Sequence, residues 1–291
     1  MKLSRDIESP RPLESGREGP VALSVILPCY RAAGLALESA ERLASALMRR
    51  VNRWEIIIVD DGGRDFPDDW TDGNRGVGGS VRLIRLPENR GKGAAVAAGM
   101  RAARGSVRIY TDIDLPYGTS SILLVESLIR NRHFHMVIGD RNFPQSRYVA
   151  DLPVMRRLAS RVFSQLTATL VTGGFFDTQC GLKGFRGDVA EALFRLQRVE
   201  RFAFDVELIY LALTYGLEIK RIPVTLEANL TSSVKVFRDA LQTCKDLAHL
   251  QINRYRGLYD SDVLRDLVAN ECASAVRELK SSSDQRARSL P

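Results

Sequence analysis

The first 115 residues alternate short apolar runs with longer stretches in which apolar residues recur at helical spacing. Each run has the length and composition of a buried strand, and each ends in polar residues, proline or glycine. Strands that alternate with helices predict an α/β fold with a mostly parallel sheet and helices on both faces. The predicted strands are centred on residues 25–27, 55–59, 81–84 and 107–111, and the predicted helices are residues 35–50 and 92–104.

The second half of the chain adds helices and one further strand. Residues 217–226 have the pattern of a strand, and Pro223 places that strand near a sheet edge, because proline cannot donate to a central ladder. Residues 72–79 are rich in glycine and show no apolar period, so we expect a mobile loop there. Three further helices are predicted at residues 153–172, 203–215 and 234–256.

Length and composition favour one α/β domain with polar ends. The chain has 291 residues, 45% hydrophobic and 26% charged, as in an ordinary globular protein. Residues 1–20 mix charges with proline, serine and glycine and are predicted to be disordered. We therefore expect the α/β domain at residues 21–258 and a helical, polar and partly disordered tail at residues 259–291.

Charge and cysteine content narrow the function classes. The formal net charge of +7 suits phosphate-bearing ligands or an anionic membrane, or is simply a solvated basic surface. No zinc-ligand spacing or helix-turn-helix signature accompanies it, so nucleic acid is the least favoured partner. The four scattered cysteines are typical of a reducing cytosol. No apolar stretch reaches the ~20 residues of a membrane-spanning helix, so we expect a cytoplasmic protein.

The candidate chemistry begins with Asp112 and Asp114, directly after the predicted strand at residues 107–111. If the segment stays extended, the two carboxylates point the same way. Such a pair suits Mg²⁺ or Mn²⁺, which favour oxygen ligands and keep positions open for a diphosphate. The same pattern also occurs as a turn or helix cap. Because open α/β sheets bind ligands at the carboxyl ends of their strands, several acidic strand ends favour the metal site.

Six ordered motifs extend this interpretation over most of the chain. They are Val25–Tyr30, Val59–Gly62, Asn89–Val96, Thr111–Pro116, Asp177–Phe185 and Phe204–Glu207. Together they resemble the inverting family 2 glycosyltransferases of the Rossmann-like GT-A fold. Within that family, the chain is most similar to the branch of dolichyl-phosphate glucosyltransferases and dolichyl-phosphate mannose synthases. The last two motifs favour the glucosyltransferase side.

The resemblance implies a nucleotide site at the ends of the first two strands. Pro28 and Tyr30 would line the pocket of the base. Asp60 or Asp61 would accept a hydrogen bond from the base, because uracil and guanine rings present N–H donors.

The resemblance also assigns the groups that meet the diphosphate and the metal ion. Lys92 stands at the start of a predicted helix, where exposed amides and the helix dipole favour an anion. Asp112 would contact the ribose or the metal ion, and Asp114 would bind the metal ion, Mg²⁺ or Mn²⁺. Both aspartates would thereby act in catalysis.

A lipid phosphate is the acceptor that this branch implies, and basic side chains should hold it. The resemblance points to Arg141, and to Arg156 with Ser160 one helical turn later, because the guanidinium fork suits phosphate. Asp205 and Glu207 would act in catalysis as a base or as ligands of the sugar hydroxyls. The alternative for both is a negative charge at a helix N-terminus.

The chain departs from the family pattern in three places. Relatives commonly continue the first motif as Tyr-Asn-Glu, where this chain has arginine and alanine at residues 31–33, and Gly63 stands where serine is common. Many relatives also carry C-terminal transmembrane helices. The helix at residues 234–256 has apolar and basic positions instead. It lies on an anionic membrane as a peripheral contact, or it packs on its own domain or on a second subunit of a homodimer.

These observations predict a metal-dependent inverting glycosyltransferase. It would move a hexose from a nucleotide sugar, UDP-glucose in first place, to a polyprenyl or dolichyl phosphate at the inner membrane face. A soluble hydroxyl compound, such as a natural product or a polysaccharide precursor, is the alternative acceptor. A nucleotidyltransferase is less favoured, because residues 30–34 lack the glycine-rich, basic signature that this class shows after its first strand.

Overall fold

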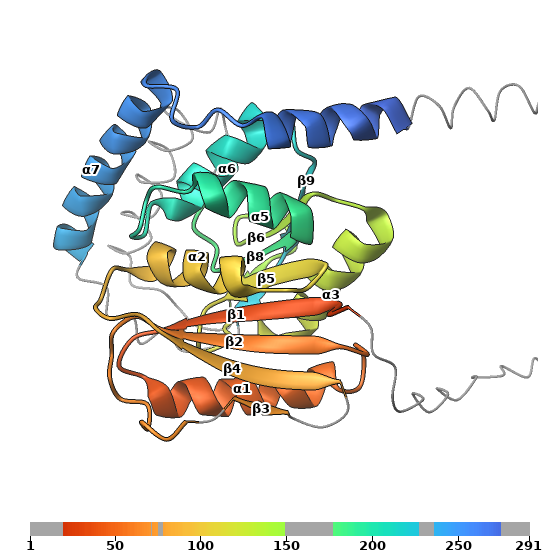
Figure 1. Cartoon of the computed structure of the whole chain (residues 1–291), viewed down its shortest axis with the longest axis vertical. Helices are drawn as coiled ribbons and strands as arrows, with labels where there is room; N and C mark the ends of the chain where they lie inside the picture. Colours follow the sequence, from red (N-terminus) through yellow and green to blue (C-terminus); the bar gives the residue numbers. More distant parts are fainter. Residues whose placement is uncertain (1–19, 71, 75–77, 149–176, 227–235, 275–291) are drawn as a thin grey trace, which may run out of the picture.

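The computed structural model describes residues 20–70, 72–74, 78–148, 177–226 and 236–274. An eight-stranded sheet runs through the molecule in the order β3-β4-β2-β1-β5-β8-β6-β9 (Figure 1). Its strands are β1 (Leu23–Cys29), β2 (Trp54–Asp60), β3 (Gly73–Asn74), β4 (Gly79–Arg85), β5 (Val107–Thr111), β6 (Met136–Asp140), β8 (Leu182–Arg186) and β9 (Ile219–Pro223). A separate parallel pair is formed by β7 (Arg147–Tyr148) and β10 (Thr225–Leu226).

The sheet is mostly parallel, which confirms the predicted α/β class. The strands β4, β2, β1 and β5 pair in parallel, as do β6 and β9. In contrast, β3 and β8 run antiparallel to their neighbours. Because β8 runs against β5 and β6, its first residues lie at the edge where those two strands end. This carboxyl edge carries the candidate site.

Helices cover both faces of the sheet, as predicted, because alternate strand residues point to opposite sides. In β1, Val25 and Leu27 join a core with α1 and α3, whereas Ile26 joins a second core with α2, α5 and α6. The helices are α1 (Ala33–Leu47), α2 (Lys92–Ala102), α3 (Gly118–Arg132), α5 (Gly187–Leu196), α6 (Phe204–Thr214) and α7 (Val236–Tyr255).

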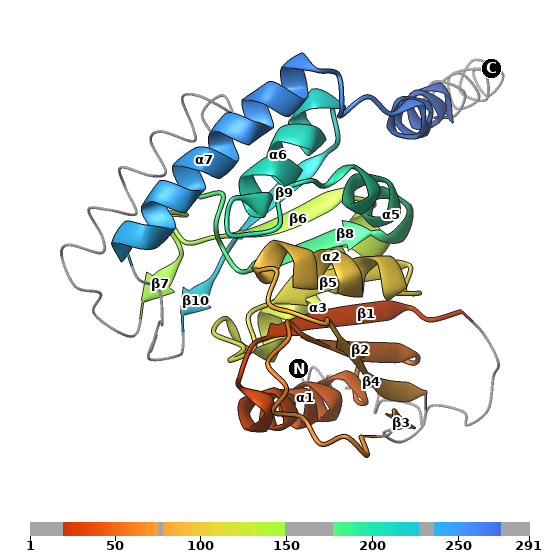
Figure 2. The ribbon, with the colours of Figure 1, turned by 60° about the vertical axis from the view of Figure 1, so that its left-hand side comes forward.

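The C-terminal part of the described chain packs on the second of these cores. The helix α7 lies beside α6 (Figure 2). In α7, Leu250 is fully buried, and the Arg254 guanidinium lies 5.5 Å from the centre of the Tyr210 ring of α6. Tyr259 continues this contact before a last helix at residues 262–274. This end of α7 therefore packs on its own domain, one of the placements that the sequence predicted.

The elements predicted before residue 112 are confirmed, with small shifts at their ends. The edge position inferred from Pro223 is also confirmed, because β9 is the last strand of the sheet. The loop predicted at residues 72–79 is wrong in part. Gly73 and Asn74 form β3 and pair antiparallel with the start of β4, and backbone pairing of this kind needs no apolar period.

Besides β3, the sequence did not predict α3, α5, β6, β7 or β8 individually. Of these strands, β6 and β8 carry the buried charged residues Asp140 and Lys183, which shorten the apolar run that marks a buried strand. The helix predicted at residues 153–172 lies outside the described residues. In the ranges that the structure describes, no helix has the length and apolar content needed to span a membrane.

Candidate active site

Charged side chains from three parallel strands meet at the carboxyl edge of the sheet. Asp60 ends β2, Asp140 ends β6, and Asp112 follows β5 directly. The antiparallel strand β8 begins at the same edge, where Leu182 pairs with Thr111. The topology therefore brings separate motifs of the sequence to one place, as expected for an open α/β sheet.

The segment that carries Asp112 and Asp114 is a turn, and the extended continuation of β5 considered above is wrong. The Leu115 amide donates to the Asp112 carbonyl at 3.0 Å, and Leu115 has a φ of 48°, a conformation uncommon for a residue with a bulky side chain. The Asp112 amide still donates to the Gly181 carbonyl at 3.2 Å, in the register of the β5–β8 ladder, so the chain leaves the extended conformation only after Asp112. The two carboxylates still interact, since burial and the charge of Asp112 raise the pKa of Asp114.

Lys92, the first residue of α2, is bound to Asp112. Its Nζ atom donates to Asp112 Oδ1 at 2.5 Å. Burial disfavours the charged ammonium, but the carboxylates of Asp112 and Asp205 outweigh burial and raise the pKa of Lys92. The helix begins after Gly91, whose φ of 112° favours glycine. A cation thus stands at a helix N-terminus, which itself favours anions.

Asp114 differs from Asp112 in its partners. In the ranges that the structure describes, no lysine, arginine or histidine forms an ion pair with its half-buried carboxylate. Two carboxylates and one ammonium, that of Lys92, leave one negative charge. No group of three or more metal-binding side chains occurs among the described residues. Two carboxylates with open positions nevertheless fit Mg²⁺ or Mn²⁺, because such ions are often bound by one or two carboxylates together with substrate phosphates.

Gly181 allows β8 to approach Asp112 closely. A Cβ atom at this position would lie 1.9 Å from Asp112 Oδ2, far inside the contact distance of any two heavy atoms. Its carbonyl also receives the hydrogen bond of the Asp112 amide. The glycine of the Gln-Cys-Gly sequence therefore has a geometric role beside the candidate metal ligand.

The first aspartate after the apolar run of β2 holds the loop that follows. Asp60 Oδ1 accepts from the Gly63 amide at 2.7 Å, and its Oδ2 accepts from the Arg64 amide at 3.2 Å. A Cβ atom at Gly63 would lie 2.6 Å from the Arg31 amide nitrogen. The two departures from the family pattern, Arg31 and Gly63, therefore lie against each other, and the close approach explains why a glycine stands here.

The second aspartate connects β2 to the turn before α2. Asp61 Oδ1 accepts from the Arg90 amide at 2.9 Å, and Oδ2 accepts from the Gly91 amide at 2.8 Å. Burial raises the pKa of Asp61 despite these bonds, which lower it. Asp61 thus fixes the approach to Lys92. Contact of Asp60 or Asp61 with a nucleotide base stays a prediction.

Tyr30 offers an open aromatic ring beside this loop. Its side chain is 45% exposed, and the Arg31 guanidinium lies 5.2 Å from the ring centre. Pro28 is partly buried in β1. A role for Pro28 and Tyr30 in the base pocket also stays a prediction.

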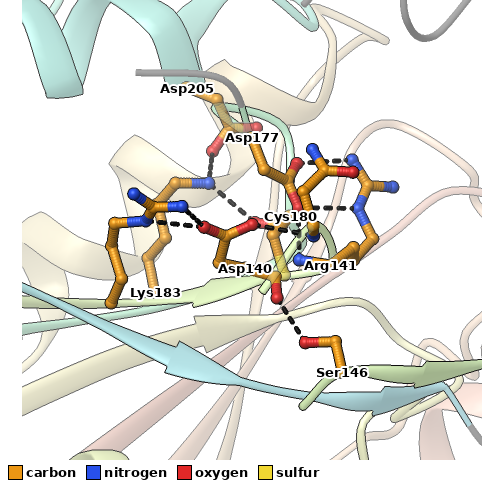
Figure 3. Close-up of polar contacts among 9 residues, drawn as sticks. Asp140, Arg141, Ser146, Asp177, Cys180, Lys183 and Asp205 are labelled. Atoms are coloured by element: carbon orange, nitrogen blue, oxygen red, sulfur yellow. Dashed lines mark hydrogen bonds and ion pairs between the residues drawn. The ribbon is translucent and has the colours of Figure 1, made fainter. Parts of the chain in front are cut away.

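At the end of β6, buried carboxylates are paired with guanidinium groups (Figure 3). Arg141 binds Asp177 through Nε at 3.1 Å and Nη2 at 2.8 Å, and its amide donates to the same carboxylate at 2.6 Å. Burial disfavours the ionised Asp177, but Arg141 outweighs burial and lowers the pKa of this carboxyl. Asp140 is held by Arg221 Nε at 2.6 Å and by the Asn142 amide at 2.8 Å. Each carboxylate here has its own cation.

Asp205 lies in the first turn of α6 with its side chain buried. Its Oδ1 accepts from Lys183 Nζ at 2.5 Å and from the Tyr110 hydroxyl. The position agrees with the alternative of a helix N-terminal charge. A role for Asp205 as a base or sugar ligand stays a prediction.

Glu207, also in the first turn of α6, is fully buried. It accepts from the amides of Arg198 and Val199, at 3.0 and 2.9 Å, and from the Tyr259 hydroxyl at 2.6 Å. Burial raises the pKa of Glu207 although these bonds lower it. The carboxylate ties the chain before α6 to the C-terminal segment, and these contacts favour a structural role over the predicted catalytic one.

Two predicted acceptor residues, Arg156 and Ser160, lie outside the described residues, so their role stays a prediction. The sequence also gave no role to Asp177 or Lys183, although both lie inside a motif. Their signal was a charged residue within an otherwise apolar or glycine-containing segment. Their partners are far away in sequence and become visible only when the strands are ordered.

The comparisons with known proteins agree with this geometry. The model of the family "Glycosyl transferase family 2" matches residues 24–194, more than half of the chain. The chain belongs to glycosyltransferase family 2. It is therefore an enzyme that transfers a glycosyl group, and the nucleotidyltransferase alternative is excluded.

Relatives and a solved structure resemble this glycosyltransferase over most of its length. It is 30% identical over 260 residues to dolichyl-phosphate beta-glucosyltransferase of Homo sapiens, covering 84% of this chain and 79% of that protein. The Drosophila melanogaster protein of the same name is 32% identical over 237 residues, with 77% and 73% covered. Glucosyl-3-phosphoglycerate synthase of Mycobacterium tuberculosis, in complex with Mn²⁺, UDP and glucosyl-3-phosphoglycerate, is similar with a TM-score of 0.55 and 19% identity, covering 79% of this chain and 80% of that chain. That likeness shows the GT-A fold.

Proposed function

We propose that this glycosyltransferase moves glucose from UDP-glucose to a dolichyl or other polyprenyl phosphate, with Mg²⁺ or Mn²⁺ bound at Asp112 and Asp114. The observation that carries the metal site is the unbalanced carboxylate of Asp114 beside the Asp112–Lys92 pair. The names of the relatives support the sugar and the acceptor. The Mn²⁺ and UDP of the solved synthase support the donor and the metal.

The donor side follows from groups at the carboxyl edge. When bound, the metal ion offsets the charge that develops on the leaving diphosphate. We assign Lys92, the first residue of α2, to the same anion, because a helix N-terminus favours phosphate. Asp61 holds the turn before Lys92 in place, and Tyr30 presents its ring to the base.

The acceptor side needs positioning more than proton transfer. A phosphate monoester is ionised near neutrality, so its oxygen can form the bond to the anomeric carbon while the bond to UDP breaks on the opposite face, with inversion. Catalysis then rests largely on orientation. We assign Arg141, oriented by its two bonds to Asp177, to the acceptor phosphate, together with Arg156 and Ser160. The occupied carboxylates of Asp205 and Glu207 are consistent with a reaction that uses no carboxylate base.

A lipid acceptor also implies contact with a membrane surface during catalysis. Lys245 and Arg254 of α7 are exposed, and such cations attract anionic lipids. Flotation with anionic vesicles at low salt measures this contact. We expect the wild type to bind and a Phe237→Glu variant to bind less, whereas an unbound wild type would contradict peripheral association.

The proposed function is tested by incubating the protein with Mg²⁺ or Mn²⁺ and a panel of nucleotide sugars, with and without a short polyprenyl phosphate. We expect metal-dependent release of UDP from UDP-glucose that is stimulated by the lipid phosphate. Phosphoglyceric acid is a suitable probe of a soluble hydroxyl acceptor. If it stimulates the release of UDP and the lipid phosphate does not, the acceptor is a soluble compound. No release from any donor would contradict the proposal.

A further inference from the structure

Lys183 is a fully buried lysine under the candidate metal site. It belongs to β8 and pairs in register with Tyr110 of β5, two residues before Asp112. A buried ammonium is costly unless it is paired and hydrogen-bonded. The contacts that stabilise the Lys183 ammonium therefore show what this residue holds in place.

The ammonium of Lys183 connects two separate elements (Figure 3). It donates to Asp205 Oδ1 in α6 at 2.5 Å and to the Cys180 carbonyl at 2.7 Å. The Tyr110 hydroxyl donates to the same oxygen of Asp205. The strand β5, the helix α6 and the segment before β8 are thus tied together around one carboxylate.

The segment held by Lys183 leads directly to Asp112. Cys180 is followed by Gly181, whose carbonyl accepts from the Asp112 amide at 3.2 Å. The Cα of Gly181 lies so close to Asp112 Oδ2 that an added Cβ would come within 1.9 Å of it. A shift of the Cys180 carbonyl therefore moves the surface on which the Asp112 carboxylate rests.

We propose that Lys183 is a positioning residue that orients Asp112 toward the metal ion by anchoring the Cys180–Gly181 segment. Lys183 touches neither the nucleotide nor the metal ion and acts through Gly181. This inference rests on the metal site of the proposed function. It gives the buried pair with Asp205 a purpose beyond stability, because the same ammonium serves both partners.

The test measures the binding of Mn²⁺ by calorimetry in the presence of saturating UDP. The Lys183→Met variant has a side chain of similar length but lacks the N–H donors of the ammonium. Glu55→Gln is the matched control, because Glu55 is a buried carboxylate in the same sheet, bound to Arg82 at 2.9 Å and Ser24 at 2.7 Å, at the opposite edge. We expect both variants to unfold at a lower temperature, and only Lys183→Met to weaken the binding of Mn²⁺, by about tenfold or more.

A double variant keeps the test decisive if Lys183→Met does not fold. Lys183→Met combined with Asp205→Asn removes both members of the buried pair, and thereby avoids an unpaired buried charge. We expect the double variant to regain stability but not the affinity for Mn²⁺, because the Cys180 carbonyl stays without its anchor.

Three results would overturn the inference. Wild-type affinity for Mn²⁺ in both Lys183 variants contradicts it directly. An equal loss of affinity in Glu55→Gln shows that general loosening is the cause. A wild type that binds UDP but no Mn²⁺ or Mg²⁺ contradicts the metal site of the proposed function, and the inference with it. The first two results contradict the inference alone, so the two failures can be told apart.

Discussion

Two acidic pairs of this chain look alike in sequence and differ in their surroundings. Asp112 and Asp114 are two residues apart after β5 and are half-buried, and within the described residues only Asp112 forms an ion pair, with Lys92. Asp205 and Glu207 have the same spacing in the first turn of α6, but both are buried and accept hydrogen bonds from several donors. The comparison teaches that the number of hydrogen-bond partners, more than residue type, separates the carboxylates proposed to bind a metal ion from those with a structural role.

The physical reason lies in the cost of burying a carboxylate. An ionised carboxylate removed from water is stable only with partners that replace its hydration. Lys183 and Tyr110 supply them for Asp205, and backbone amides with Tyr259 supply them for Glu207. We therefore expect loss of Asp114 to reduce activity and loss of Glu207 to reduce stability.

The largest effect is expected at Asp114. Asp114→Asn removes a charged metal ligand, which should cost several kcal/mol of transition-state stabilisation and lower kcat/KM by about 10²-fold or more. The unfolding temperature should not fall, because burial and Asp112 disfavour the charge of Asp114. Initial rates across a Mn²⁺ titration measure the loss, with the exposed Asp69→Asn as control. Turnover near that of the wild type would remove Asp114 from the metal site.

Arg141→Ala tests the acceptor side of the comparison. Removing a charge-assisted contact costs about 1.5–3 kcal/mol, so the KM for polyprenyl phosphate should rise about 10–100-fold while the affinity for UDP stays nearly constant. Asp205→Asn should change that KM less, because a phosphate acceptor needs no base. Steady-state kinetics of both variants decide between the acceptors. If Asp205 proves essential and Arg141 dispensable, a neutral hydroxyl is the acceptor.

Gly181→Ala tests whether the residue before β8 fixes the position of the Asp112 carboxylate. The new methyl group would meet the Asp112 carboxylate, so Asp112 must move and the affinity for Mn²⁺ should fall about tenfold. Gly34→Ala in α1 is the matched control, since a Cβ there meets nothing within 4 Å. Calorimetry with Mn²⁺ and UDP measures both. Equal affinities would show that Asp112 tolerates a different position.

We expect Asp61→Ala to weaken the binding of the nucleotide more than the binding of the metal ion. It leaves the amides of Arg90 and Gly91 without their acceptor, and an unsatisfied buried donor costs about 1–3 kcal/mol. The turn before Lys92 should loosen, and the Kd for UDP should rise about tenfold, as calorimetry can measure. An unchanged Kd for UDP in this variant and in Asp60→Ala would place the base elsewhere.

The smallest effect concerns Glu207 and depends on pH. Because burial raises its pKa in the folded state, the folded protein binds more protons at this site than the unfolded chain. Its contribution to stability is therefore full below the unfolded pKa and declines as the pH rises through the folded pKa. Glu207→Gln should accordingly cost more at pH 4 than at pH 7, measured by chemical denaturation. The opposite trend would mean that the hydrogen bonds dominate burial.

Much of this fold could be predicted from the sequence, because β1, β2, β4 and β5 are apolar runs whose ends carry the motifs. The contacts between residues of different motifs could not be predicted. Arg141 binds Asp177, and Lys183 binds Asp205, only because β8 is inserted antiparallel between β5 and β6. No local pattern encodes that insertion. The turn after Asp112 was one of the two alternatives that the sequence left open, and the hydrogen bond from the Leu115 amide to the Asp112 carbonyl decides for it.

The most direct measurement is the structure of the product formed from UDP-glucose and a polyprenyl phosphate. After incubation with Mn²⁺, nuclear magnetic resonance identifies the linkage of the sugar to the lipid phosphate. The account predicts a β-linked glucosyl phosphate that forms with the metal ion and is absent in Asp114→Asn. An α-linked product, transfer in the absence of any divalent ion, or glucose found only on soluble compounds would contradict it.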